Sequence, residues 1–411
     1  MVQSIFKWFR ITYIRMITSI AFIPALVAIF FLFLSYAMVQ FDFSEGGKAI
    51  KSNAQWLRLK DASTARSVIS TITGGIISLT VFSFSMVMIL LNQAASQMTN
   101  RVLDKLIGNR FQQIVLGFYI GTIVYALFLL STIRDLDSGI YVPAISTYLL
   151  IALTVVDIFL FIYFLHYVTQ SVKYDTIIHR VHDATLQSLK KTCTLKSSRD
   201  VRVNMQNGIV INAYKSGIYQ GFDYEGLVSY CKKQDLIIYF YKTTGTSVII
   251  NTPLLRVISK REIPDRLEQD LPVLINIHRG QNIESNYYYG FRQLMEVAVK
   301  ALSPGINDPG TAVLSLQALG DLLSFLQDHY PVTHVKDDKG EVRIISKQRT
   351  FDEIFEECLG SIWDYGKKDR LVQKELFHIL TQLDNGNPLI IKMMAVVQKA
   401  ILNKNFMNFK F

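Results

Sequence analysis

The chain has 411 residues, of which 50% are hydrophobic, and its formal net charge is +10. An apolar share this high, with a positive mean hydropathy, argues against an ordinary soluble protein and predicts membrane segments. No nucleic-acid-binding motif accompanies the positive charge, so we expect no nucleic acid partner. The three cysteines have neither the density of a disulfide scaffold nor the spacing of a zinc site, and we expect no metal and no cofactor.

Four segments are apolar over the roughly 20 residues that a helix needs to cross a membrane. We expect them near residues 17–39, 68–91, 113–132 and 143–168, within a transmembrane domain of residues 1–168. Backbone groups in lipid must bond within their own segment, so each is predicted to be a helix. The first segment also has the basic flank of a cleaved signal peptide, although its apolar run is longer than such a peptide needs.

The distribution of basic residues predicts the orientation. Lys and Arg are more frequent in the N-terminal tail, the second loop and the exit of the fourth span than in the first and third loops. Basic residues accumulate on the cytoplasmic side of membrane proteins. We therefore expect both termini in the cytoplasm and the spans in a bacterial inner membrane.

Small and polar side chains form stripes on the predicted spans, as either close helix packing or a hydrophilic pathway requires. Gly117 and Gly121 are a Gly-x-x-x-Gly pair, which favours close packing. An ionised Asp157 near the middle of the membrane would cost at least ~2.5 kcal/mol, and no Lys or Arg in a span core neutralises it. It is either hydrogen-bonded to a neighbouring helix or it serves ions or protons. His166 lies on the opposite side of the same segment and is expected at the membrane interface. The candidate ion-pathway residues are Thr71, Ser78, Ser146, Thr154, Asp157 and His166.

The remaining chain predicts a cytoplasmic α/β domain. Residues 169–206 continue as an amphipathic helical stalk, on which His179 and His182 lack a third metal ligand and suit a solvated face. Residues 207–260 predict a small, β-barrel-like unit with one inserted helix. Residues 261–411 are expected to be mainly helical.

Two further patterns refine this domain. Two hairpins are expected within residues 208–222 and 235–251, each around a turn that contains glycine. Two apolar stripes in the later part repeat at seven-residue spacing and predict core helices. Their members are Tyr287, Phe291, Leu294, Ala298 and Ala301, then Ala312, Leu316, Leu319, Leu323 and Leu326.

The stretch "ALSPGINDPGTA", residues 301–312, separates these two helical patterns. Asp308 before Pro309 is typical of a helix start, since the carboxylate accepts free backbone N–H groups and proline suits the first turn. Ser303 can turn the chain out of the preceding helix. The stretch is therefore a joint, or it forms a polar pocket for an ion, a small anion or a partner's backbone. The candidate pocket residues are Ser303, Asn307 and Asp308.

This stretch, with "FSFSMVMILLNQAASQMTNRVL", "FLHYVTQSV" and "SGIYQGFDYEGLV", resembles a widespread family of predicted bacterial integral membrane proteins of unknown function. The resemblance covers most of the chain. It implies a four-helix membrane region with a C-terminal cytoplasmic domain, and it supplies no reaction. The family pattern has His-His where this chain has His166 and Tyr167, which weakens a paired-histidine metal site.

The sequence thus predicts an α-helical membrane protein with four transmembrane helices followed by a cytoplasmic α/β domain. Our leading hypothesis is a homo-oligomeric ion channel or ion conduit that the cytoplasmic domain assembles or gates. The alternative is a membrane-anchored scaffold or sensor that binds a partner or small ligand through that domain. The chain has no phosphate-binding glycine loop, nucleophile elbow or metalloprotease motif, so we do not expect it to be an enzyme. An enzyme that acts on a lipid or envelope precursor is kept only as a third hypothesis. The expected partners are the lipid bilayer, further copies of the chain, and ions or a small ligand.

Overall fold

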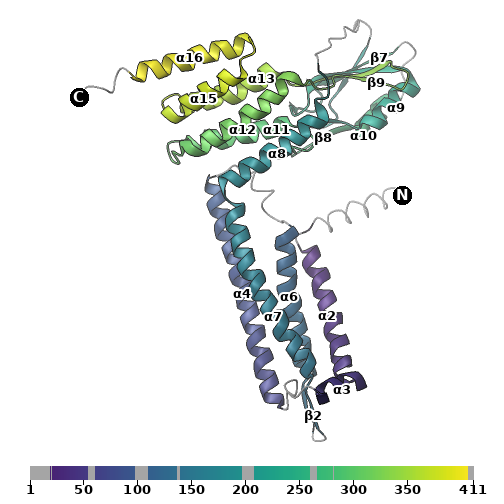
Figure 1. Cartoon of the computed structure of the whole chain (residues 1–411). Coiled ribbons are helices and arrows are strands. Elements are labelled where there is room, and N and C mark those ends of the chain that lie inside the picture. Colours follow the sequence, from purple (N-terminus) through teal and green to yellow (C-terminus); the bar gives the residue numbers. More distant parts are fainter. Residues whose placement is uncertain are drawn as a thin grey trace, which may run out of the picture. The chain divides into compact units, whose positions relative to one another are not determined.

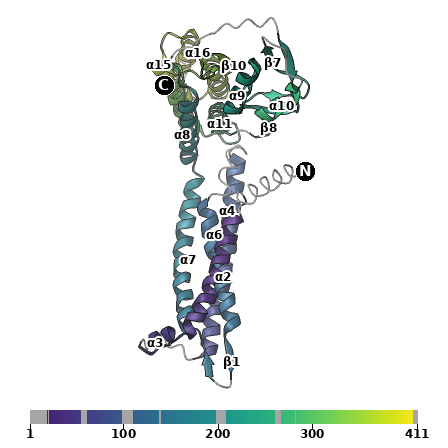
Figure 2. The same ribbon diagram turned by 90° about the vertical axis from the view of Figure 1, so that its right-hand side faces the viewer.

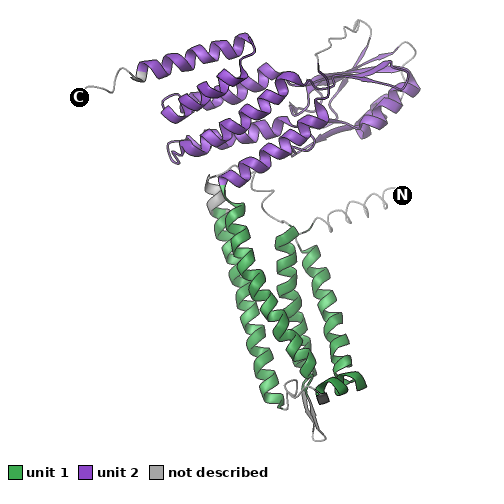
Figure 3. Ribbon diagram, viewed as in Figure 1, with its two compact units in different colours: residues 1–96, 102–173 green, residues 97–101, 174–411 purple. Residues whose placement is uncertain are grey.

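A computed structural model describes residues 19, 21–53, 61–97, 110–136, 139–196, 208–259, 266–280 and 282–405. The chain divides into two compact units, which Figure 3 distinguishes by colour. Unit 1 comprises Met1–Ser96 and Val102–Lys173, and unit 2 comprises Gln97–Arg101 and Tyr174–Phe411.

The described part of unit 1 contains four long helices, which lie side by side in Figures 1 and 2. They are α2 (Phe22–Phe43), α4 (Ala62–Gln97), α6 (Arg110–Thr132) and α7 (Ala144–Ser171). The short helix α3 (Glu45–Asn53) follows α2, and an antiparallel hairpin of β1 (Arg134–Leu136) and β2 (Gly139–Tyr141) follows α6.

Helix α6 is the most enclosed of these helices and packs closely against α2. In its most apolar stretch 44% of the residues are buried, against 22% in α2. A Cβ atom at Gly121 would lie 2.8 Å from the Phe31 ring, and one at Gly117 would lie 3.1 Å from Cβ of Val27. A side chain at Gly121 would overlap the Phe31 ring, and one at Gly117 would require Val27 to shift, so the Gly-x-x-x-Gly pair allows the two backbones to come close together.

The helices differ in detail from the expected spans. Helix α2 ends at Phe43 rather than at 39, and residues 17, 18 and 20 of the expected span lie outside the described part of the chain. Helix α4 begins before and ends after the expected 68–91. A fifth helix, α12 (Pro309–Asp328) of unit 2, is also long and apolar enough to cross a membrane by length and composition, where the sequence predicted four.

Unit 2 begins with α8 (Tyr174–Thr192), which starts after α7 has ended at Ser171 and packs against α11 (Tyr288–Ala301) and α12. The expected stalk of 169–206 is therefore the end of one helix and a separate helix of the unit 2 core. Residues 197–206 of that prediction lie outside the described chain.

Two β-sheets form one end of unit 2 (Figure 1). The first sheet has the order β3-β7-β5-β10-β9, in which β10 pairs with β5 in parallel and the other pairs are antiparallel. Its strands are β3 (Ile209–Asn212), β5 (Leu236–Thr243), β7 (Pro253–Ser259), β9 (His334–Lys336) and β10 (Val342–Lys347). The second sheet has the order β6-β4-β8, with β4 (Gly217–Phe222), β6 (Ser247–Val248) and β8 (Ile275–His278). Helices α9 (Tyr224–Gln234) and α10 (Leu267–Leu274) accompany them.

This arrangement corrects the expected hairpins and does not reproduce a barrel. Strands β3 and β4 lie in different sheets, and so do β5 and β6. The turn after β5 explains the second case, because Gly245 has a φ of +93° and donates its N–H to the carbonyl of Tyr219 on β4 at 2.7 Å. The turn therefore carries the chain from one sheet to the other. The rings of Tyr219 and Phe240 stack at 5.2 Å and join β4 to β5 in the core.

Helices make up the rest of unit 2, and α12 packs against α8, α11 and α15. Every member of the two seven-residue stripes is buried, so those stripes do form core faces as predicted. The later helical segments are α13 (Phe351–Phe355), the π-helical turn Glu356–Gly360, α14 (Ser361–Gly366), α15 (Arg370–Leu383) and α16 (Pro388–Asn405).

Candidate functional site

Asp157 lies at the middle of α7 and is fully buried inside unit 1. Neither of its carboxylate oxygens accepts a hydrogen bond of good geometry among the described residues; the nearest hydroxyl, that of Thr122, is within reach but donates to the backbone instead. Thr122 and Tyr119 of α6 lie beside it, and the Tyr119 hydroxyl, close to Ser83 of α4, also lacks a partner of good geometry there. We call Asp157, Tyr119, Thr122 and Ser83 the Asp157 cluster.

The hydroxyls of this cluster do not neutralise the carboxylate. Thr122 donates its hydroxyl to the carbonyl of Phe118 at 3.0 Å, and Ser83 donates to the carbonyl of Leu79 at 2.8 Å. Such bonds to the preceding helical turn leave only oxygen lone pairs to face a neighbour. A charged carboxylate in this position is unfavourable unless a proton or a cation accompanies it. The cluster is therefore suited to take up one positive charge.

Apart from Ser146, the other candidate pathway residues are less buried than Asp157, and Thr154 lies one helical turn before it on α7. Thr154 is half-buried and donates its hydroxyl to the carbonyl of Leu150 at 2.8 Å. Thr71 and Ser78 are exposed on α4, on a different side from the buried Ser83 of the Asp157 cluster. His166 is also exposed on α7.

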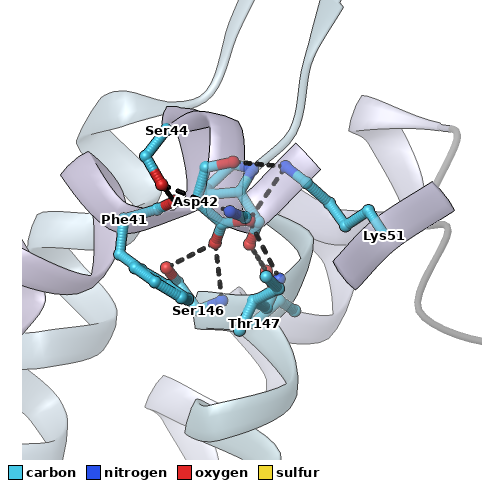
Figure 4. A network of polar contacts seen from close by, with 9 residues as sticks. Phe41, Asp42, Ser44, Lys51, Ser146 and Thr147 are labelled. Carbon is cyan, nitrogen blue, oxygen red and sulfur yellow. Dashed lines mark hydrogen bonds and ion pairs between the residues drawn. The ribbon is translucent and has the colours of Figure 1, made fainter. Parts of the chain in front are cut away.

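Ser146, the remaining candidate, belongs to a second polar group around Asp42 (Figure 4). Asp42 of α2 accepts the N–H of Ile145 at 3.2 Å and both the N–H and the hydroxyl of Ser146 at 2.7 Å. Lys51 of α3 lies 3.1 Å from the same carboxylate and donates to the Asp42 carbonyl at 2.6 Å. We call Asp42, Lys51, Ile145 and Ser146 the Asp42 clasp.

In the Asp42 clasp, a carboxylate of helix α2 accepts hydrogen bonds from the free backbone N–H groups at the start of α7. The residue before α7, Pro143, offers no side-chain cap, so the first N–H groups of the helix need an outside acceptor. An acid at a helix N-terminus is also favoured by the helix dipole. Asp42 is fully buried yet has a partner for each oxygen, which makes it a structural acid.

The "ALSPGINDPGTA" stretch is a joint whose polar groups bond one another. Asp308 accepts the N–H of Thr311 at 3.2 Å and its hydroxyl at 2.6 Å, and so caps α12. Ser303 donates its hydroxyl to the carbonyl of Lys300 at 2.6 Å. Asn307 is exposed and has a φ of +50°, which asparagine tolerates. Burial, and then the nearby Asp308 carboxylate, raise the pKa of Tyr174, so the joint lies beside the start of α8.

A cavity of about 420 Å³ lies elsewhere in unit 2, and its lining includes His329, Arg349 and Asn387 but none of the three signature residues. Arg349 is engaged there, because it lies 3.0 Å from Glu357 and stacks over the Tyr288 ring at 3.9 Å. Over the described residues, no three His, Cys, Asp or Glu side chains come together as a metal site requires. His182 instead lies 2.7 Å from Asp321 and links α8 to α12.

Several of these residues were not found from the sequence. Asp42 follows the expected end of the first span and looks like a loop acid; the missing cap on α7 was the available signal. Ser83, Tyr119 and Thr122 carry no such signal, because nothing in a uniformly apolar helix says which of its polar side chains turns inward. Thr311 completes the cap that Asp308 predicted.

Together, the long apolar helices and the α/β unit define a multi-pass helical membrane protein with a folded C-terminal domain. Residues 17–382 match the family model described as predicted membrane protein (DUF2254), and the chain belongs to that family.

Relatives are found in mycobacteria. An uncharacterized protein of Mycobacterium tuberculosis (strain CDC 1551 / Oshkosh) is 25% identical over 328 residues, which cover 77% of this chain and 63% of the relative. An uncharacterized protein of Mycobacterium bovis (strain ATCC BAA-935 / AF2122/97) matches to the same extent. The chain thus spans less than two thirds of the length of these relatives. No solved structure matches the chain.

Proposed function

We propose that this multi-pass membrane protein is a homo-oligomeric ion conduit of a bacterial inner membrane, with Asp157 as the group that takes up the ion. The observation that carries the proposal is a fully buried acid at the middle of a membrane helix with no hydrogen-bond partner of good geometry among the described residues. Intramembrane acids of this kind mark ion and proton pathways. Unit 2 assembles or gates the conduit, and the proposal assigns it no reaction.

The proposal uses four membrane helices, those of unit 1. Helix α12 is long enough to be a fifth, but it packs against α8, α11 and α15 and buries its apolar stripe among them. A helix enclosed in this way is a core helix of a folded domain rather than a lipid-facing one. With four spans, both ends of the chain would lie on the same side, and the excess of Lys and Arg there supports the cytoplasmic side.

The chemistry of the Asp157 cluster favours a proton or a monovalent cation. A single carboxylate supplies one negative charge, and the nearby groups are hydroxyls. Divalent cations such as Ca²⁺ take six or more oxygen ligands and usually several carboxylates. One buried carboxylate among hydroxyls is therefore suited to a proton or to an ion such as Na⁺.

The polar side chains of α4 support more than one subunit. Thr71, Gly75 and Ser78 lie exposed on an outward side of the helix, and a Cβ atom at Gly75 would have no neighbour within 4 Å. Small and polar residues on a membrane helix favour contact with another helix over contact with lipid. In an oligomer this side of α4 faces a neighbouring subunit or a shared pore.

The test is ion flux by the purified full-length protein in proteoliposomes. We expect proton or Na⁺ flux from the wild type and loss of most of that flux in Asp157→Asn, which keeps the shape of the side chain and removes its charge. The matched control is Asp175→Asn, at an exposed acid in the first turn of α8, which should conduct as the wild type does.

Two results would overturn the proposal. One is the absence of flux from wild-type protein that is folded and inserted in the bilayer. The other is a subunit count of one in lipid, since four helices rarely enclose a pore.

A scaffold or sensor is the second candidate, and the 420 Å³ cavity in unit 2 is the observation that favours it. Ser303 and Asp308 use their polar groups within the joint, so a ligand would bind in that cavity rather than at the signature stretch. Ligand-dependent stabilisation of the purified protein, together with absent flux, would favour this function over the conduit.

A further inference from the structure

Helix α16 leaves much of its apolar surface uncovered. It packs against α15, and Ile390 and Val397 are fully buried. Away from α15, Ile391 is 50% exposed and Leu402 is 52% exposed. Ile391 and Leu402 are eleven positions apart, which places them on nearly the same side of a helix.

The lysines of α16 flank this apolar side. Lys392 and Lys399 are exposed, are seven positions apart, and so form a second row next to Ile391 and Leu402. The helix contains no acidic residue. A helix with an apolar row beside a basic row is typical of those that lie at the surface of an anionic membrane.

The start of α15 adds similar side chains at the same end of the helix pair. Helices α15 and α16 are joined by a short turn and lie antiparallel (Figure 1), so the start of α15 is near the end of α16. Leu371 is 57% exposed there, and Tyr365 of the preceding helix is 56% exposed. Lys367 and Lys374 are exposed beside them in the sequence. We call these exposed side chains of the helix pair the α15–α16 edge, and its members are Tyr365, Lys367, Leu371, Lys374, Ile391, Lys392, Lys399 and Leu402.

The acids near this edge do not outnumber its basic residues. Asp384 is exposed in the turn before α16, and Asp352 accepts a hydrogen bond from Asn387 at 3.0 Å beside the start of α16. Asp369 accepts the N–H groups of Leu371 and Val372 and caps α15. Asp364 is exposed and lies 3.9 Å from Lys367. The basic side chains of the edge are Lys367 and Lys374, on either side of the cap in the sequence, and Lys392 and Lys399 on α16. Lys368 and Arg370 are exposed at the start of α15 and add to the lysines of the edge.

We propose that the α15–α16 edge docks on the anionic surface of the bilayer in which unit 1 is embedded. The covalent link is one argument, because unit 2 starts at Tyr174, directly after a membrane helix that ends at Ser171. A tether this short holds the lipid surface at a high effective concentration. Charge is the other argument, since lysine rows complement anionic headgroups while the exposed apolar side chains enter the interface.

A second copy of the chain fits the same edge less well. Two α16 helices packed through Ile391 and Leu402 would bring their Lys392 and Lys399 rows together without acids to balance them. Like charges across an interface are unfavourable.

The family match ends at residue 382, so α16 lies beyond the part of the chain that the family description covers.

The experiment places an environment-sensitive fluorophore on the edge of the full-length protein in vesicles. Leu402→Cys is labelled, and the native cysteines are buried, with burial raising the pKa of Cys193 and Cys231 to about 12. In vesicles of phosphatidylcholine and phosphatidylglycerol, we expect a blue-shifted emission that spin-labelled lipids quench. The label at Val273→Cys, which is 81% exposed on α10, is the control and should show neither effect.

Charge is tested in the same vesicles. Phosphatidylcholine alone, salt at about 1 M, where the screening length falls to ~3 Å, or Lys392→Glu combined with Lys399→Glu should each remove the shift. Lys336→Glu, at an exposed lysine of β9, should leave it unchanged. Because these side chains are exposed, the reversal should not unfold unit 2, and an unchanged melting temperature checks this.

Three outcomes overturn the proposal. They are no quenching in anionic vesicles, quenching that is indifferent to lipid charge and to the lysine reversal, and efficient disulfide cross-linking between unlabelled Leu402→Cys residues of two copies, which requires the two edges to be in direct contact. None of these readouts depends on whether the protein conducts ions.

Discussion

The described part of unit 1 contains two fully buried acids, Asp42 and Asp157, which differ in their hydrogen-bond partners. Asp42 has partners for both oxygens, from the start of α7 and from Lys51. Asp157, at the middle of the same α7, has no hydrogen-bond partner of good geometry among the described residues. A buried acid with a full set of partners stabilises the fold, whereas a buried acid without them is a cost that stability alone does not explain.

The largest effect is expected for Asp42→Ala. Removing the carboxylate leaves the N–H groups of α7, the Ser146 hydroxyl and Lys51 without their acceptor inside the protein. We expect a loss of roughly 3 kcal/mol in the free energy of unfolding, as for other broken buried charge pairs. Thermal unfolding in detergent measures it, and a melting temperature equal to that of the wild type would show that the clasp is not structural.

A smaller effect is expected for Asp308→Ala. The variant loses the cap of α12, which is worth about 1 kcal/mol. Thr311→Val is the matched comparison, since it removes the hydroxyl donor but keeps the backbone N–H, and it should cost less. A ligand-binding defect in a variant as stable as the wild type would instead favour a pocket at the signature stretch.

The lowered pKa of Asp337 should make the stability of unit 2 depend on pH. Its bond from Arg343 at 2.8 Å, together with backbone N–H groups of Lys339 and Glu341, lowers its pKa below the ordinary value of 3.8. A lowered pKa contributes stability above the ordinary value and loses it as the pH falls through the lowered one. The wild type should lose stability below about pH 4, and Asp337→Asn should lose less over that range. Unfolding midpoints measured between pH 7 and 3 give the comparison, and identical acid profiles would contradict it.

The smallest effect on stability is expected for Asp157→Asn. No partner is lost, and the amide does not carry the charge that makes the buried carboxylate unfavourable. We expect a change of less than about 1 kcal/mol, in either direction. If the variant is destabilised as strongly as Asp42→Ala, Asp157 has structural partners after all.

The sequence predicted those parts of the molecule whose signal is local. The seven-residue stripes from Tyr287 and Ala312 are core faces, because burial repeats with the helix period. The partners of the strands were not predictable in the same way: the expected hairpin of β5 and β6 fails because Gly245 turns the chain toward Tyr219 of another sheet. Strand pairing depends on contacts that a periodic pattern does not contain.

In the candidate site too, the residue with a local sequence signal was predicted and the residues placed by tertiary contacts were not. Asp157 was found from the sequence, since an acid in an apolar run stands out. Its neighbours Tyr119 and Ser83 were not, because their side of the helix is set by packing against other helices. Asp42 was missed for a related reason, as the groups that it bonds follow about a hundred positions later in the chain.

The most direct test of the central claim is ion flux in proteoliposomes by Asp157→Asn and Asp42→Asn, measured side by side and normalised to the amount of folded protein. The predicted result is that Asp157→Asn melts like the wild type and loses its flux, while Asp42→Asn melts earlier and keeps its flux per folded molecule. Equal flux in the two variants, or no flux from the wild type, would contradict the claim.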